Sequence, residues 1–433
     1  MWALVAGGLA ALLVLVAAGV GAFLVLGPDD DGSGGSDLAA TEGTNSDFEA
    51  VTSEPARTWS WKSGDEVRWT TVGPGFTVVL LGGEAGFVVL DDDGKEMWRS
   101  ERHDYSGVWV NEETETIQSS WYGPVTATAD GDTTSDSGSI VYDYDGKILW
   151  KDTDDDRYLE AVEEDGYLVH DSEDKTLTKL SAPDGPGEWS IDGENVTTTD
   201  DWIYAIDGDT MARHSRSDGS VDWKIDLPAG WKGPKQWYEI NLRANDDLVV
   251  VVGHATYGFS ADKGAALWEA PGEGVITATA GNRFAVIEEG TYDQAQEMTM
   301  PSNGPYPIYD TSGKVGSLSF STSTPYSAVQ MLRVDGKGDQ VNFSPDGGAL
   351  YDAAGKLVEE GYTDGYVALD DGCYLLDRAT VSFRKWHDSE DAWSLPITDA
   401  ESIGDTANHR DIYVDVGDGF LVVNDKHHVW RYE

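Results

Sequence analysis

The sequence predicts an all-β domain built as a β-propeller, a closed ring of four-stranded antiparallel blades. Three observations lead to this prediction: a short phrase recurs along most of the chain, its copies are spaced like propeller blades, and β-rich runs precede them. In the copy at residues 139–150, apolar strands flank the turn pair Asp145-Gly146, and the second strand carries Trp150. An Asp-Gly pair between apolar runs is a strong hairpin signal.

The chain begins with 25 consecutive uncharged residues, 2–26, which are rich in Ala, Leu, Val and Gly. A helix of that length would span roughly 37 Å, more than the ~30 Å hydrocarbon core of a bilayer. A cleavable signal peptide has a shorter apolar region of about 7–15 residues. We therefore expect residues 1–26 to form an uncleaved transmembrane signal anchor in a single-pass protein of the cell membrane.

Gly, Ser, Asp, Thr and Glu dominate residues 27–57, which we expect to form a flexible acidic linker before a propeller over residues 58–433. No Lys or Arg precedes the apolar segment, so the positive-inside rule does not settle its orientation. Because the acidic run at residues 29–31 leads toward the large domain, we place the propeller outside the cytoplasm.

The composition narrows the classes of partner. The chain has 433 residues with 29 Lys and Arg against 79 Asp and Glu, for a formal net charge of −50. This charge disfavours binding to nucleic acid or to an anionic membrane surface. The acidic residues are spread along the chain, which fits either a solvated surface or adaptation to high salt. The single cysteine, Cys373, rules out an internal disulfide.

Five copies of the phrase share a glycine followed four residues later by a tryptophan. Glycine supplies the positive φ that a hairpin turn demands, and the tryptophan fills the wedge between radially packed sheets. The copies lie 52, 39, 34 and 45 residues apart, close to the length of a four-stranded blade, about 40–50 residues. The expected structural repeat residues are Gly94, Trp98, Gly146, Trp150, Gly185, Trp189, Gly219, Trp223, Gly264 and Trp268.

The second half of the chain keeps the turns but has Ser317 and Glu359 at the tryptophan position. Counting these degenerate copies gives nine marks, whereas the length, (433 − 57) / 8 = 47 residues per blade, favours eight. We therefore expect eight blades, with seven as the alternative. One mark would belong to a split blade that the N-terminal strand around Trp59 and Trp61 closes.

The segment Tyr257-Gly-Phe-Ser-Ala-Asp-Lys-Gly-Ala-Ala-Leu-Trp268 resembles the repeat of quinoprotein-type (PQQ-like) β-propellers. The resemblance covers roughly residues 60–433 and is specific for fold rather than activity. In the dehydrogenases with this repeat, it implies a bound quinone, a calcium ion, a catalytic Asp and a disulfide of neighbouring cysteines. Cys373 has no partner for that disulfide, and no Asp matches by motif, so we expect neither a cofactor nor enzymatic activity.

Other chemistry-bearing patterns are incomplete. The acidic clusters at residues 91–93, 130–136 and 154–156 offer oxygens for calcium, but none has the full EF-hand loop. The eight histidines are scattered, and no HExxH or Cys/His spacing is present. We therefore expect no metal site.

Aromatic residues gather in the segments between repeats, where loops on a rigid scaffold usually carry binding. The alternative is that these aromatics belong to the core between blades. The candidate partner-binding residues are Tyr105, Trp109, Trp121, Tyr122, Trp231, Trp237, Tyr306 and Tyr309.

Together these patterns favour a membrane-anchored extracytoplasmic propeller that binds or scaffolds other proteins of the cell envelope. The membrane would be contacted through the N-terminal helix. Two alternatives stay open: a quinone- or calcium-dependent enzyme, and an envelope protein that binds glycan.

Overall fold

The computed structural model describes residues 50–433, except for 102, 104, 122–125, 128–132, 135–136, 154–156, 164, 183–184, 194, 230, 232–241, 254, 272–273, 281–282, 289–291, 294–297, 300–305, 319–329, 335–338, 344–347, 352–356, 363–364, 370–371, 378–379, 386–387, 389 and 398–411. Within this part the chain is all-β, apart from the short 3-10 helix η3 (Gly83–Ala85). The described strands form nine four-stranded sheets, which we number as blades 1 to 9, and two small two-stranded sheets.

The first three blades follow one another along the chain. Blade 1 comprises β2 (Val67–Gly73), β3 (Phe76–Leu81), β4 (Phe87–Asp91) and β5 (Glu96–Arg99). Blade 2 comprises β6 (Tyr105–Asn111), β7 (Thr116–Trp121), β10 (Gly138–Asp143) and β11 (Ile148–Asp152). Blade 3 comprises β12 (Arg157–Glu163), β13 (Gly166–Asp171), β14 (Thr176–Leu180) and β15 (Gly187–Asp192).

Blades 4 to 6 continue the pattern. Blade 4 comprises β16 (Asn195–Thr198), β17 (Trp202–Asp207), β18 (Thr210–Ser215) and β19 (Val221–Asp226). Blade 5 comprises β20 (Leu242–Ala244), β21 (Leu248–Val252), β22 (Ala255–Ser260) and β23 (Ala266–Pro271). Blade 6 comprises β24 (Gly274–Ala280), β25 (Arg283–Glu288), β28 (Tyr306–Asp310) and β29 (Gly313–Leu318).

The last three blades contain the degenerate repeats. Blade 7 comprises β30 (Gln330–Val334), β31 (Asp339–Phe343), β32 (Gly348–Tyr351) and β33 (Leu357–Tyr362). Blade 8 comprises β34 (Gly365–Leu369), β35 (Gly372–Asp377), β36 (Thr380–Lys385) and β37 (Trp393–Pro396). Blade 9 comprises β38 (Tyr413–Gly417), β39 (Phe420–Asn424), β40 (His428–Tyr432) and, from the other end of the chain, β1 (Arg57–Lys62).

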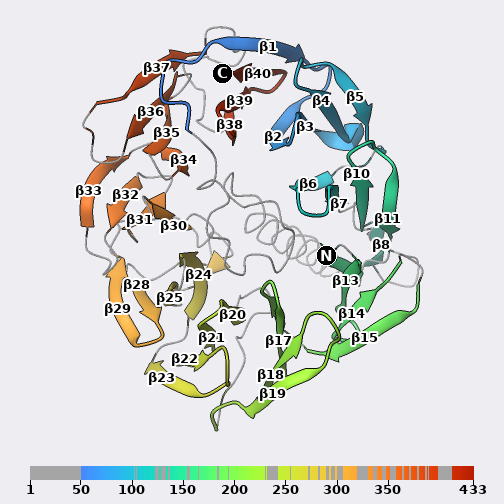
Figure 1. Ribbon diagram of the computed structural model, residues 1–433, viewed down its shortest axis with the longest axis vertical. Helices are drawn as coiled ribbons and strands as arrows, with labels where there is room; N and C mark the ends of the chain where they lie inside the picture. Colours follow the sequence, from blue (N-terminus) through green and yellow to red (C-terminus); the bar gives the residue numbers. More distant parts are fainter. Residues whose placement is uncertain are drawn as a thin grey trace, which may run out of the picture.

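The sheets surround a common centre, with the first strand of each blade innermost and the fourth outermost (Figure 1). The middle strands β3 and β21 are buried along their whole length because both faces pack against neighbouring blades. The outermost strand β19 instead has only exposed and half-buried residues. The core therefore lies between blades and has no single centre.

The ring closes within blade 9, where β1 pairs antiparallel with β40 and places Trp61 opposite Val429. The backbone of Ala56 exchanges two hydrogen bonds with that of Glu433, at 2.8 and 3.1 Å. Blade 9 also contacts blade 1 through β38, β39 and β2. This arrangement confirms the predicted split blade with Trp59 and Trp61 in its N-terminal strand.

The count of nine blades in the described part of the chain corrects the expected eight and the alternative seven. Each of the nine sequence marks falls in a different blade, the degenerate copies included. Dividing the length by an assumed blade size gave too few blades because blades without insertions are shorter than that average. Nine also exceeds the usual range for propellers of about four to eight blades.

Neighbouring blades are joined by a contact between an outermost tryptophan and the next blade's turn. Gly146 has φ +84°, and a Cβ there would lie 2.6 Å from the Trp98 ring of blade 1. The Trp98 Nε1–H donates to the carbonyl oxygen of Tyr144 at 2.9 Å. The same contact between a ring and a positive-φ glycine pairs Trp59 with Gly94, Trp189 with Gly219, Trp223 with Gly264, and Trp268 with Gly313.

The junction between blades 2 and 3 is the exception among these repeats. Gly185 is not among the glycines of positive φ, and a Cβ there would approach only Ala182 of its own turn. Lys175 has φ +54° in the preceding turn. Trp150, only 1% exposed, stacks on Tyr167 with ring centroids 6.3 Å apart. The predicted glycine role therefore holds for four of the five copies.

The chain before β1 is also held by the ring. Ala50 and Val51 are buried although they fall in the predicted linker. The Val51 N–H donates to the Tyr374 hydroxyl at 2.9 Å, and the Trp393 Nε1–H donates to the Val51 carbonyl at 2.6 Å. Burial raises the pKa of Tyr374 to about 12. Trp393 of blade 8 thus donates to the carbonyl of Val51. Trp98 of blade 1 instead donates to a carbonyl in the turn of the next blade.

No helix long and apolar enough to cross a bilayer occurs in the part of the chain that the structure describes. The predicted anchor, residues 1–26, and residues 27–49 of the predicted linker lie outside that part.

We predict that Gly146→Ala destabilises the domain more than Gly419→Ala. Both glycines have positive φ, +84° and +74°, so both substitutions introduce similar backbone strain. Only at Gly146 would the new methyl overlap an indole, because nothing lies within 4 Å of a Cβ at Gly419. Overpacking of this kind typically costs about 1–3 kcal/mol. Urea denaturation of the two variants measures the difference, and equal losses would contradict the tryptophan contact.

We also predict that Tyr374→Phe lowers the free energy of unfolding by about 1–3 kcal/mol, since it leaves the buried Val51 N–H without its acceptor. Tyr167→Phe is the control, because that hydroxyl makes one long bond of 3.5 Å to Leu149. Thermal unfolding of both variants compares them. A loss at Tyr374 no larger than that at Tyr167 would show that the Val51 contact contributes little.

Candidate binding face

The order of strands gives the ring two faces with different connections. Within each blade the strands run antiparallel from the centre outward (Figure 1). Connections from the second to the third strand, and from the fourth strand to the next blade, therefore emerge on one face, which we name the loop face. Connections from the first to the second strand, and from the third to the fourth, emerge on the opposite face, the turn face.

The long connections are confined to the loop face. Between described strands, every connection of more than ten residues joins strand ends on that face, whereas connections on the turn face have at most seven residues. The five long ones run from β7 to β10, β19 to β20, β25 to β28, β29 to β30 and β37 to β38. Loops on a rigid scaffold are the usual place for binding residues.

Two of the long connections contain an added hairpin. Blade 2 inserts β8 (Thr126–Ala127) and β9 (Thr133–Thr134) between its second and third strands. Blade 6 inserts β26 (Tyr292–Asp293) and β27 (Met298–Thr299) at the equivalent place. These blades are four positions apart in the ring of nine, so the insertions arise on nearly opposite sides of the centre (Figure 1).

The structure buries half of the predicted partner-binding aromatics. Tyr105, Trp109 and Trp121 of blade 2 are 0%, 8% and 2% exposed, and Tyr309 of blade 6 is 5% exposed. Tyr309 stacks on Trp268 of blade 5 with ring centroids 4.7 Å apart. The alternative assignment, to the core between blades, describes these four residues, because little of their surface is available to a partner.

Two of the other four predicted residues lie in a long connection or at its end. Trp231, half-buried, follows β19 and packs beside the core between blades 4 and 5. Tyr306 begins β28 at the loop face. Tyr122 and Trp237 lie outside the described residues.

A cluster of polar and aromatic side chains surrounds Trp121, the last residue before the blade 2 insertion. The His103 ring stacks on Trp121 with centroids 4.2 Å apart and planes inclined by 19°. The Lys151 ammonium lies 5.7 Å from the Trp121 ring centroid. Glu101 accepts from Lys151, and its Oε2 lies 3.5 Å from the His103 Nε2. The root of the insertion is thereby held from two elements, the β5–β6 connection and β11.

The electrostatics of this cluster follow from the Glu101 carboxylate. Its hydrogen bond from Lys151, more than that from His103, holds the pKa of Glu101 below its usual range. Beneath it, the hydroxyls of Tyr105 and Tyr142 are 3.3 Å apart, and burial raises the pKa of both. The arrangement suits precise positioning of Trp121 and its insertion.

Sequence reasoning identified Trp121 and Tyr105 but missed Glu101, His103 and Lys151. The charged residues stand in a connection and on an outer strand, positions that ordinarily carry solvated charge. The stretch Glu101-Arg-His-Asp-Tyr105, which ends on a candidate aromatic, was the one available signal.

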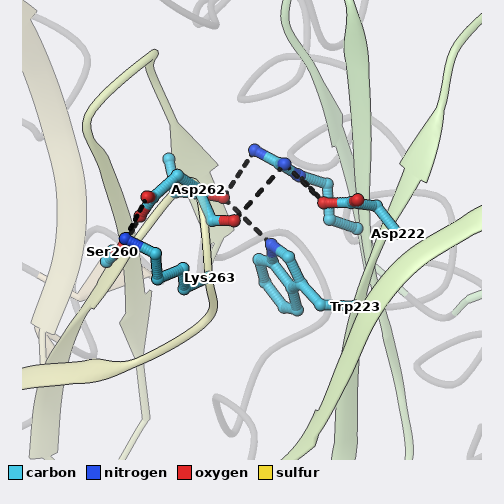
Figure 2. A network of polar contacts seen from close by, with 7 residues as sticks. Asp222, Trp223, Ser260, Asp262 and Lys263 are labelled. Atoms are coloured by element: carbon cyan, nitrogen blue, oxygen red, sulfur yellow. Dashed lines mark hydrogen bonds and ion pairs between the residues drawn. The ribbon is translucent and has the colours of Figure 1, made fainter.

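The turn face has a different character, because its polar groups join blades to one another. The Arg213 Nε–H donates to the Asp222 carboxylate at 2.9 Å within blade 4. Its NH1 donates to the backbone oxygen of Ala261 in blade 5 at 2.7 Å, and the Trp223 Nε1–H donates to the same oxygen at 3.0 Å. Figure 2 shows Asp222 and Trp223 facing the turn that carries Asp262 and Lys263.

Ion pairs cross two further junctions on the turn face. The indole nitrogens of Trp59 and Trp189 have no hydrogen-bond partner in the described structure. At these two junctions, charged side chains make the link between blades instead of an indole hydrogen bond. The pairs are Arg431 with Asp92 across blades 9 and 1, and Arg216 with Glu163, at 2.5 Å, across blades 4 and 3.

In the described part of the chain, no group of three or more His, Cys, Asp or Glu side chains is arranged to hold a metal ion. Cys373 is buried in β35.

No family model and no curated protein matches the chain. Among solved structures, it is similar to BamB from Moraxella catarrhalis, with 11% identity over 88% of this chain and 98% of that chain and a TM-score of 0.45. A eukaryotic initiation factor is 9% identical over 89% of this chain and 92% of that chain, with a TM-score of 0.50.

A third similar structure is NirN, a dihydro-heme d1 dehydrogenase, which is 15% identical over 78% of each chain with a TM-score of 0.46. At identities this low, a structural match is evidence for the fold alone. The match to the initiation factor supports it, and together with the nine sheets it defines the protein as a β-propeller.

We predict that salt stabilises the domain, because 79 acidic residues oppose 29 basic ones. Raising ionic strength from 0.1 M to 1 M shortens the Debye length from about 10 Å to about 3 Å and screens the like-charge repulsion. The melting temperature should rise between these two NaCl concentrations. A melting temperature that falls would mean that the ion pairs between blades outweigh the repulsion.

Proposed function

We propose that the chain is a membrane-anchored extracytoplasmic β-propeller, of quinoprotein-type repeat, that binds or scaffolds other proteins of the cell envelope through its loop face. One observation carries the proposal: every long connection between the described strands emerges on that face. Binding sites concentrate in loops that a rigid scaffold positions. A propeller fold alone does not specify a function.

The entry point of the chain supports this use of the loop face. β1 is the fourth strand of blade 9, so it begins at the turn face. Val51 is held by Trp393, which begins the fourth strand of blade 8 at the same face. An anchor that precedes residue 50 therefore joins the propeller on the turn-face side and leaves the loop face directed away from the attachment point.

Site-specific photo-cross-linking of the full chain in its own membranes tests the proposal. Exposed loop-face positions Glu173 and Asp209 receive the cross-linker in one pair of variants, and exposed turn-face positions Glu113 and Asp145 in a matched pair. We expect reproducible envelope proteins to be captured from the loop face and not from the turn face.

Two outcomes would count against the proposal. Capture from the turn face alone would place the interaction on the wrong surface. Retention of polysaccharide with no reproducible protein from either face would favour the glycan-binding alternative.

A further inference from the structure

His170 is a buried histidine at the loop-face end of blade 3, and it belongs to none of the contacts described above. It lies on β13, opposite Tyr158 of β12 and Leu177 of β14. The His170 side chain is enclosed, with the residue 6% exposed, and its ring centroid lies 4.9 Å from that of Tyr158. Tyr158 itself is 41% exposed, so its ring covers the histidine from solvent.

The two ring nitrogens of His170 have unequal surroundings. Nε2 lies 3.5 Å from the carbonyl oxygen of Gly193 in the β15–β16 connection. Nδ1 is buried and has no hydrogen-bond partner in the described structure. The neutral imidazole with its proton on Nε2 fits this site, since Nδ1 then needs no acceptor. The imidazolium does not fit, because it would bury a second N–H donor unsatisfied.

The charged groups near the ring do not remove this mismatch. Asp171 follows His170 on β13, and Arg157, beside Tyr158 on β12, pairs with Asp152 at 3.2 Å. The Gly193 N–H donates to the Lys175 carbonyl at 2.8 Å and so fixes the connection over the ring. Burial lowers the pKa of His170 and outweighs Gly193 and Asp171, which act in the opposite direction.

We propose that His170 is a pH-sensitive lock on the loop-face end of blade 3, closed when its imidazole is neutral and opened when the ring takes up a proton. The bistable elements are the Tyr158 ring and the β15–β16 connection at Gly193. One of them must move away before water can reach Nδ1. Acidification therefore loosens the junction between blades 3 and 4 at the loop face.

The direction follows from proton linkage. In the closed state the pKa of His170 lies below the ordinary value of about 6.5 that applies when the site is open. Above that ordinary value both states are neutral and the lock contributes fully. As the pH falls below about 6.5, the open state binds the proton first, so the stability of the closed state is progressively lost.

Hydrogen–deuterium exchange of the full chain in detergent tests the lock, with rates corrected for the intrinsic effect of pH. Between pH 7.5 and pH 5.0, we expect the opening equilibrium of β12 and β13 amides to rise by up to about 30-fold, the limit for an imidazole that stays neutral when closed. In His170→Phe, which keeps a ring against Tyr158 but cannot titrate, that rise should be absent. His427→Phe, which removes a histidine of blade 9, should retain it.

Two results would overturn the proposal: exchange in β12 and β13 that does not change with pH in the wild type, or the same pH dependence in His170→Phe. If His170→Phe does not fold, the imidazole nitrogen resonances of the wild-type protein decide. A His170 ring that is half-protonated at the ordinary value of about pH 6.5 rules the lock out, and one that is still neutral there supports it.

Discussion

The packing of an outermost tryptophan on the next blade's turn is the contact on which the ring depends. A propeller blade cannot bury both faces by itself, so each junction must supply specific contacts. Trp98 does this through an indole hydrogen bond to Tyr144 and through ring contact at Gly146, where no side chain could fit. Between blades 9 and 1, an ion pair replaces the indole hydrogen bond. Between blades 8 and 9, the carbonyl of Val51 replaces the acceptor in the turn.

This contact explains why so much of the fold could be predicted from the sequence. Glycine and tryptophan at fixed spacing are read directly from the chain, and both have stringent requirements, positive φ at Gly146 and a wedge to fill at Trp98. The number of blades was missed by one because it was inferred from an average length, although the nine marks were present. Blade 9 shows the reason, since strands from both ends of the chain share it and its length cannot be measured along the sequence.

The candidate site could be predicted less well, because the position of a side chain depends on partners distant in sequence. Tryptophan is a residue type common in exposed binding sites, yet His103 and Lys151 cover Trp121. Nothing local distinguishes Glu101, which joins His103 to Lys151, from the many solvated acids of the chain. His170 is similar, since its enclosure by Tyr158 and Gly193 follows from sheet register and from a connection that crosses over it.

The same tryptophan contact accounts for the difference between the two faces. In five blades the turn between the third and fourth strands receives the tryptophan of the preceding blade. Inserting residues at Gly146 or Gly264 would therefore separate the indole from its carbonyl partner. Connections on the loop face do not receive these tryptophans. Long insertions there cost only the modest entropy of closing a longer loop. The contacts between blades thus constrain the length of the connections on the turn face, while the connections on the loop face can be longer. On this reasoning, the hairpins β8–β9 and β26–β27, which are added to the four-stranded blades on the loop face, are the described elements on which the proposed binding would depend.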